Sequence, residues 1–128
     1  MESSNCLFCD SQQMGLRTVL DARFWFVIMD NFPVGKGHAL VILKRHHPDM
    51  FDLSWPEWKE LQDVMEHTKR HLDEELKPDG YNIGINCGQA AGQTVFHLHI
   101  HLIPRHNGDI ENPRGGIRNF KKPLVPYA

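Results

Sequence analysis

The sequence predicts an α+β domain built on an antiparallel sheet. Three observations lead to this prediction: two apolar, β-rich segments joined by a short Pro/Gly turn, one long amphipathic segment, and two further strand-like segments after it. Strands followed by a helix and then by more strands are typical of α+β domains with antiparallel sheets. The length of 128 residues fits one domain with one core, spanning residues 1–128.

The first two strands are expected to form a hairpin. Residues 24–30 (FWFVIMD) are rich in aromatic and β-branched types, and residues 38–44 (HALVILK) have the same character. Between them, residues 31–37 (NFPVGKG) supply the Pro and Gly of a turn.

The one long helix is expected over residues 55–76. Ser54 and Glu57 have the spacing of a capping box at its start, and Pro78-Asp79-Gly80 ends it with turn residues. Apolar side chains at helical spacing predict a buried stripe that faces the core, formed by Trp58, Leu61, Met65, Leu72 and Leu76.

Two more strands follow the helix. Residues 81–86 (YNIGIN) are expected to form the third, and residues 95–103 the fourth, which Pro104 closes. A Gly/Ala/Gln loop over residues 87–93 lies between them. Residues 105–128 contain Pro, Gly and basic residues with little periodicity, so we expect an irregular arm packed on the body or on a partner subunit.

Composition and charge exclude several classes of protein. With 41% hydrophobic and 23% charged residues, the chain is typical of a globular protein and not of a disordered one. A formal net charge of -2 leaves no broad basic surface, so no nucleic acid is expected as a partner. Residues 1–10 do not resemble a signal peptide, and the longest apolar run, 24–29, is too short to span a bilayer. We therefore expect a cytoplasmic protein without a membrane partner.

Three histidines alternate with apolar residues in the fourth expected strand. Because successive side chains of a strand point to opposite faces, His97, His99 and His101 are expected to share one face, about 6–7 Å apart. The apolar side chains between and around them are expected to enter the core: Phe96, Leu98, Ile100 and Leu102. Imidazole acts near neutral pH as a nucleophile, a proton donor or a metal ligand. The row therefore predicts a site that holds a nucleophile between groups contacting the reacting ester.

The loop before the histidines fits the same chemistry. Residues 91–94 (AGQT) offer flexible backbone, an amide and a hydroxyl next to the histidine face. Backbone N–H groups of such loops contact phosphoryl oxygens.

Residues 92–105, GQTVFHLHIHLIPR, resemble the signature of the histidine triad family, and the resemblance runs from Cys6 to Arg105. It is closest to the Hint-like and fragile-histidine-triad branches of nucleotide hydrolases. The galactose-1-phosphate uridylyltransferase branch is disfavoured, because it carries Pro between its histidines and Gln in place of the third. The resemblance implies a five-stranded antiparallel sheet with one long helix, continued across a homodimer.

The resemblance also implies roles for individual residues. His99 matches the nucleophile that attacks an α-phosphorus and forms a nucleotidyl-histidine, which water then resolves. His101 matches a residue that contacts the phosphate and helps the leaving group, and His38 matches one that joins this catalytic network with His97. Asp30 matches a residue that holds ribose hydroxyls, for which a carboxylate has two acceptor oxygens. The residues that match polar groups near the phosphates are Asn86, Gln93 and Thr94.

The N-terminal cysteine pair predicts a zinc site. Cys6 and Cys9 form a C-x-x-C, and with Cys87 as the third cysteine a disulfide framework is not expected. Zinc prefers four Cys or His ligands in closed sites, so two ligands are expected to be histidines. The resemblance to zinc-bearing bacterial members implies a structural zinc on Cys6, Cys9, His46 and His97. His47 is the alternative to His46, and a reduced, metal-free pair is the alternative to zinc.

The expected function is that of a nucleotide hydrolase or nucleotidyl transferase. It acts at the α-phosphate of a purine nucleotide conjugate such as a dinucleoside polyphosphate, and no catalytic metal is required. The alternatives are a nucleoside phosphoramidase and a non-catalytic, zinc-stapled module that binds nucleotides or a protein. Residues 114–118 (RGGIR) form a basic cluster that either binds a polyphosphate tail or is a solvated loop.

Overall fold

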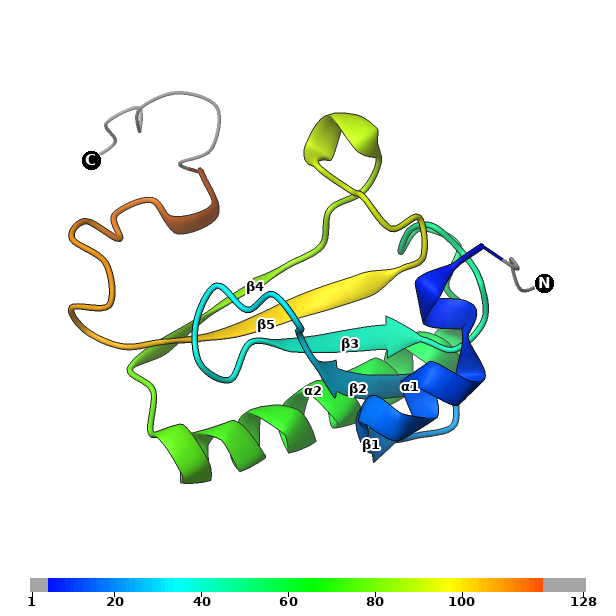
Figure 1. Cartoon of the computed structure of the whole chain (residues 1–128), viewed down its shortest axis with the longest axis horizontal. Helices are drawn as coiled ribbons and strands as arrows, with labels where there is room; N and C mark the ends of the chain where they lie inside the picture. Colours follow the sequence, from blue (N-terminus) through cyan, green and yellow to red (C-terminus); the bar gives the residue numbers. More distant parts are fainter. Residues whose placement is uncertain (1–4, 119–128) are drawn as a thin grey trace.

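The protein is an α+β domain with a five-stranded antiparallel sheet, as predicted. The computed structural model describes residues 5–118, and Figure 1 shows the sheet with one long helix along it. The strand order is β1-β2-β3-β5-β4. The strands are β1 (Thr18–Asp21), β2 (Trp25–Met29), β3 (Ala39–Leu43), β4 (Gly80–Gly84) and β5 (His99–Arg105).

The long helix α2 (Trp55–Leu76) has the predicted bounds. Its capping box forms: the Glu57 N–H donates to Ser54 Oγ at 3.3 Å, and the Ser54 N–H donates to Glu57 Oε1 at 2.8 Å. The predicted stripe is wrong at Trp58, which is 37% exposed. The buried stripe instead begins at Glu57 and continues through Leu61, Val64, Thr68 and Leu72. Trp58 lies about 100° around the helix from Glu57 and so at the edge of this stripe.

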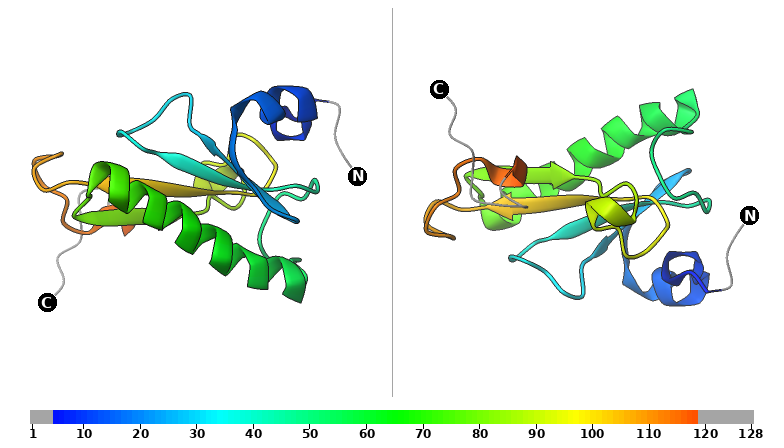
Figure 2. Two further views of the ribbon diagram at one scale, coloured as in Figure 1. Left: turned by 90° about the horizontal axis from the view of Figure 1, so that it is seen from below. Right: turned by 90° about the horizontal axis from the view of Figure 1, so that it is seen from above.

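Two layers cover the sheet, as Figure 2 shows. On one face, α2 packs on a core that includes Trp25, Val41 and Leu102. On the other face, η1 (Leu7–Cys9) and α1 (Ser11–Arg17) pack through Phe8 and Met14 on alternate residues of the same strands. Because β2 and β3 are covered on both faces, their sequences are apolar almost throughout.

Three N-terminal elements had not been predicted. β1 is only four residues long, and its side chains alternate between half-buried and exposed, so no apolar run marks it. The short helices η1 and α1 precede it. Asp10 caps α1 by accepting the Gln13 N–H at 3.1 Å, but seven residues are too few to show helical periodicity.

The histidine strand starts later and ends later than predicted. Residues 95–98 are not part of β5, and Phe96 is 49% exposed instead of buried. Pro104 does not close the strand, because β5 continues to Arg105. The register explains this: pairing with β3 stops at Leu102, so the side of Pro104 that lacks an N–H faces no partner strand. The third predicted strand, residues 81–86, is β4 and ends two residues earlier.

The chain after β5 folds back along β4. Arg105 pairs with Asp109 through two bonds of 2.7 Å, and its Nη1 donates to Asn82 Oδ1 at 2.6 Å. The short helix η3 (Gly116–Arg118) packs on β4. The predicted irregular arm is thus described as far as residue 118, and residues 119–128 lie outside the described part. Over residues 5–118, no helix combines the length and apolarity needed to cross a bilayer.

Candidate functional site

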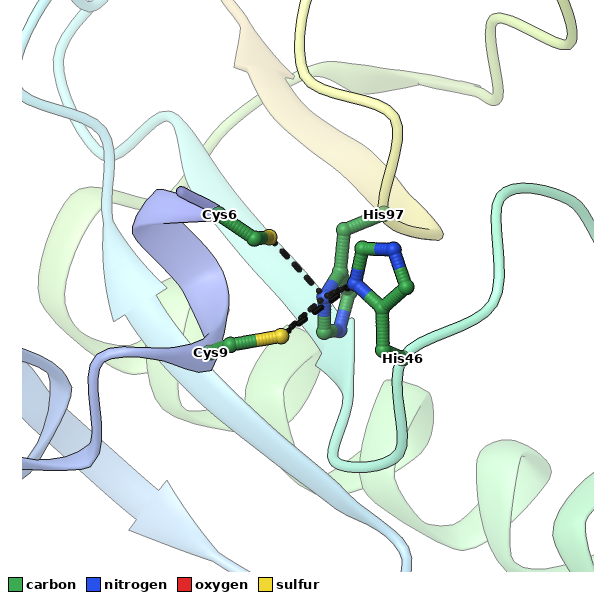
Figure 3. A group of neighbouring side chains, drawn as sticks. All are labelled: Cys6, Cys9, His46 and His97. Atoms are coloured by element: carbon green, nitrogen blue, oxygen red, sulfur yellow. Dashed lines mark hydrogen bonds between the residues drawn. The ribbon is translucent and has the colours of Figure 1, made fainter. Parts of the chain in front are cut away.

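His97 lies just before β5 and is fully buried. Its Nε2 lies 2.5 Å from the carbonyl oxygen of Leu43. A carbonyl can only accept, so Nε2 carries the ring proton and Nδ1 keeps a lone pair. That lone pair faces the two cysteines of the C-x-x-C (Figure 3).

The Cys/His cluster has the composition and spacing of a zinc site. His97 Nδ1 lies 3.3 Å from Cys6 Sγ and 3.4 Å from Cys9 Sγ. His46 Nδ1 lies 3.2 Å from both Cys9 Sγ and His97 Nδ1. All four ligand atoms lie within 4.8 Å of one another, and two thiols with two imidazoles are a typical donor set for structural zinc. The residues therefore fit the metal.

The structure decides between the two neighbouring histidines. His47 points away from the cluster, because its Nδ1 lies 3.0 Å from the Asp49 carbonyl oxygen and its Nε2 lies 3.0 Å from Asp52 Oδ2. His46 is the residue that joins the cysteines, as the resemblance implied.

Local structure positions the ligands. In η1, the Cys9 N–H donates to the Cys6 carbonyl at 3.2 Å, a turn that brings both thiols to one side. Arg45, next to His46, binds Glu57 with bonds of 2.7 and 3.0 Å and so ties this segment to the start of α2. The Arg45 hydrogen bonds lower the pKa of the buried Glu57 carboxyl, which therefore stays ionised.

His99 follows on the same face as His97. Its Nδ1 lies 2.7 Å from the His97 carbonyl oxygen, so Nδ1 carries the proton and Nε2 keeps the lone pair. The imidazole packs edge-on against Phe8, with ring centroids 5.0 Å apart, and lies 5.1 Å from the ring of His101. The three histidines therefore share one side of the sheet, as predicted, although only two of them lie in β5.

A chain of hydrogen bonds sets the tautomer of His101. The Val34 N–H donates to His38 Nδ1 at 3.2 Å. The His38 proton must then be on Nε2, which lies 2.9 Å from His101 Nδ1. His101 accepts this bond, so its own proton is on Nε2. His101 thus offers a hydrogen-bond donor beside the lone pair of His99.

His38 and His101, the two histidines of this hydrogen-bond chain, are held neutral. Burial, together with neighbouring His99 and His38, lowers the pKa of His101 to about 4, against an opposing effect of Asp30. Burial also lowers the pKa of His38, again opposed by Asp30. A cation is poorly suited to the group formed by Asp30, His38 and His101, because the Val34 N–H leaves His38 Nε2 protonated.

Asp30 lies at the edge of this network. One carboxylate oxygen accepts the Phe32 N–H at 3.0 Å, and the other lies 3.4 Å from His38 Nε2. The side chain is 18% exposed, so its oxygens are partly open to a ligand.

The loop residues fall into two groups. Gln93 is buried: its Nε2 donates to the carbonyls of Pro48 and Val95 at 2.9 and 3.1 Å, and its Oε1 accepts the Gly88 N–H at 2.8 Å. Its amide therefore braces the loop through backbone groups. Asn86 and Thr94 are exposed, and Asn86 comes opposite His99 when the β4–β5 register is continued by two residues.

Comparison with known proteins decides the family. The HIT domain profile matches residues 15–108, which is most of the chain.

The chain belongs to the HIT family. An uncharacterised HIT-like protein of Mycoplasma genitalium is 38% identical over 81% of this chain and 75% of its own length. A bis(5'-adenosyl)-triphosphatase of Dictyostelium discoideum is 39% identical over 80% of this chain and 69% of its own. A zinc-bound histidine triad protein of Mycobacterium smegmatis is 37% identical over 84% of this chain and 80% of its own, with a TM-score of 0.73.

The sequence did not reveal the backbone groups of this HIT site. The Leu43 and His97 carbonyls and the Val34 N–H set three histidine tautomers, yet backbone groups are the same in every residue and leave no signal in a sequence. Phe8, inside the C-x-x-C, was also overlooked as the ring on which His97 and His99 pack.

Proposed function

We propose that this HIT protein is a nucleotide hydrolase or nucleotidyl transferase whose nucleophile is His99. The observation that carries the proposal is the 2.7 Å contact between His99 Nδ1 and the His97 carbonyl oxygen. It places the proton of the neutral imidazole on Nδ1 and leaves the lone pair on Nε2. The substrate is a purine nucleotide conjugate, of which a dinucleoside polyphosphate is the leading candidate.

In the first step, His99 Nε2 attacks the α-phosphorus, and the bond from phosphorus to the leaving oxygen breaks. The leaving group keeps the electron pair, and His99 becomes a positively charged nucleotidyl-imidazolium. The His97 carbonyl faces the Nδ1–H of that cation and stabilises it electrostatically. In the second step, water attacks the phosphorus, the P–N bond breaks, and the nucleoside monophosphate and one proton are released.

His101 acts on the leaving group as a hydrogen-bond donor. Its pKa of about 4 keeps the ring neutral at neutral pH. His101 therefore donates a hydrogen bond from Nε2 but does not act as a positively charged acid. A neutral donor of this kind favours groups that depart as anions, such as phosphate chains. Amines need a proton in order to leave, which makes phosphoramidate hydrolysis the second candidate.

Asp30 holds the ribose in this account, and Thr94 and Asn86 contact the phosphates. Gln93 acts indirectly by bracing residues 88–95. Cys6, Cys9, His46 and His97 would hold zinc, and four protein ligands of this kind would give the metal a structural role.

The assembly and location belong to the proposal as well. β4 is an edge strand of the sheet, with Ile83 48% exposed, and we place the homodimer contact there. Light scattering on a gel-filtration column tests for the dimer. None of the three cysteines is in a disulfide, which accords with the proposed cytoplasmic location.

The first experiment identifies products from diadenosine triphosphate and adenosine 5'-phosphoramidate with the native protein and with His99→Asn. The proposal expects AMP from the native protein and none from the variant, with the same unfolding curve for both. Nucleotide binding without turnover in the native protein would instead favour the non-catalytic zinc-stapled module.

A further inference from the structure

The turn between β2 and β3 carries the N–H group that orders the histidine network. The Val34 N–H donates to His38 Nδ1 at 3.2 Å, and His38 Nε2 lies 2.9 Å from His101 Nδ1. Two backbone bonds close the base of the turn. The Asp30 N–H donates to the His38 carbonyl at 2.9 Å, and the His38 N–H donates to the Gly35 carbonyl at 3.2 Å. The position of the turn therefore decides whether the Val34 N–H reaches His38.

The side chains at the tip of this turn are exposed. Within residues 31–37, Phe32 is 86% exposed, Val34 is 76% exposed, and Lys36 is exposed as well. The turn projects on the side of the sheet that carries η1 and α1 (Figure 2). A segment with so little buried apolar surface gains little stability from its side chains. Its close contact with the body of the domain lies at its base, at Gly37.

Gly37 packs tightly between the end of α2 and β5. Its φ is 85°, in the left-handed region that favours glycine. A Cβ at this position would overlap Leu76 Cδ1, and would lie 3.1 Å from Pro104 Cγ and 3.4 Å from Leu72 Cδ2. The Leu76 side chain can rotate away, but the Pro104 ring is rigid and belongs to β5. The close approach and the backbone angle therefore both require glycine.

Gly35, two residues earlier in the same turn, has neither feature. Its φ is not positive, and a Cβ there would meet no atom of residues 5–118 within 4 Å apart from its chain neighbours. The turn thus contains one glycine that its geometry requires and one that it does not. The two positions form a matched pair for experiment.

We propose that Gly37 is a positioning residue: its close packing fixes the turn so that His38, and through it His101, is held in one tautomer. The inference rests on the proposed function, in which His101 donates to the leaving group. Without the Val34 bond, His38 can carry its proton on Nδ1. His101 then donates from its own Nδ1 and presents a lone pair on Nε2, where the leaving group needs a donor. Gly37 itself touches neither substrate nor a reacting atom.

The first test is the 15N spectrum of the histidine side chains, which distinguishes protonated from unprotonated ring nitrogens without any substrate. In the native protein, Nε2 of both His38 and His101 should be protonated and both Nδ1 atoms unprotonated. Gly37→Ala should bring the two nitrogen signals of each ring closer together, because the tautomers then exchange. Gly35→Ala, the matched control, should leave the native spectrum unchanged.

The second test is a double-mutant cycle on the turnover of diadenosine triphosphate. Gly37→Ala should lower kcat on the order of tenfold in the native background, as for the loss of one hydrogen bond to a reacting group. In His101→Asn it should lower kcat by less than about twofold, because the group through which it acts is already gone. If Gly37→Ala fails to fold, adding Leu76→Ala removes the atom that the new methyl group meets, and this double variant is compared with Leu76→Ala alone.

Two results would overturn the assignment. One is a native histidine spectrum in Gly37→Ala. The other is an equal loss of kcat in the native and His101→Asn backgrounds, which would show that Gly37 acts by another route. Neither result touches the proposed function, which fails instead if His99→Asn retains turnover. The spectrum tests the role of Gly37 even in that case, because it needs no reaction.

Discussion

The backbone carbonyl of His97 accepts the Nδ1–H of His99 at 2.7 Å, while the His97 side chain points away into the Cys/His cluster. One residue thus contributes its imidazole to the Cys/His cluster and its backbone carbonyl to the proposed nucleophile. A hydrogen bond from His97 Nε2 to the Leu43 carbonyl also fixes the orientation of the His97 ring. The position of His99 and the integrity of the Cys/His cluster are therefore linked through His97.

We expect loss of zinc to destabilise the protein. Cys9 is buried and contacts both histidines of the cluster, so Cys9→Ala should abolish zinc binding and lower the free energy of unfolding by several kcal/mol. Metal analysis and urea unfolding measure the two effects. Cys87→Ala, outside the cluster, is the control. Full zinc content and unchanged stability in Cys9→Ala would contradict the assignment.

Asp30 should discriminate between sugars. If its carboxylate binds the ribose hydroxyls, Asp30→Ala should raise KM for a ribonucleotide substrate on the order of tenfold or more, as for one charged hydrogen bond. The 2'-deoxy substrate should lose less, because it makes fewer of these bonds. Steady-state kinetics with both substrates measure the difference, and equal losses would rule out the ribose contact.

Gln93 should matter for stability and loop position. Its side chain makes three hydrogen bonds to backbone groups and is 4% exposed, so Gln93→Ala leaves buried partners unsatisfied. We expect a loss of about 1–3 kcal/mol in the free energy of unfolding. Gln89→Ala, an exposed residue of η2 (Gln89–Ala91), should change it by less than about 0.5 kcal/mol. Equal effects would show that Gln93 does not brace the loop.

The depressed pKa of His101 predicts a pH-dependent stability. The unfolded chain protonates this imidazole below its ordinary pKa of 6.5, whereas the folded protein does so only near 4. Between these values unfolding takes up a proton, so stability falls as the pH falls from 6.5 to 4. We expect the native protein to lose about 1–2 kcal/mol more than His101→Asn between pH 7 and pH 5. Urea unfolding in saturating zinc measures this loss, and parallel curves for the two proteins would contradict it.

Residue patterns predicted those parts of the fold that depend on side-chain periodicity. The capping box at Ser54 and the apolar spacing gave the bounds of α2, and the alternation around His99 gave the face that the histidines share. The short strand β1 could not be predicted, because four half-exposed residues have no periodicity of their own and are ordered by pairing with β2. Trp58 was expected in the core from its helical spacing and Phe96 from strand alternation. Both are exposed, because Trp58 lies at the edge of the buried stripe of α2 and β5 begins only at His99.

The candidate site was likewise predictable from the sequence only in part. The residue types that supply its chemistry, Cys6, Cys9 and the histidines, could be read from the sequence. Their protonation could not, because backbone groups of Val34, Leu43 and His97 determine it. The inward-turned amide of Gln93 was likewise hidden, since its partner Pro48 lies 45 residues away in the chain.

The central claim is that His99 becomes covalently nucleotidylated. Rapid acid-free quenching of the native protein with diadenosine triphosphate labelled at the α-phosphorus, followed by peptide mapping, tests it directly. The account predicts label on residue 99 within one turnover, no label on His99→Asn, and no turnover by that variant. Turnover without protein-bound label, or near-normal activity in His99→Asn, would contradict it.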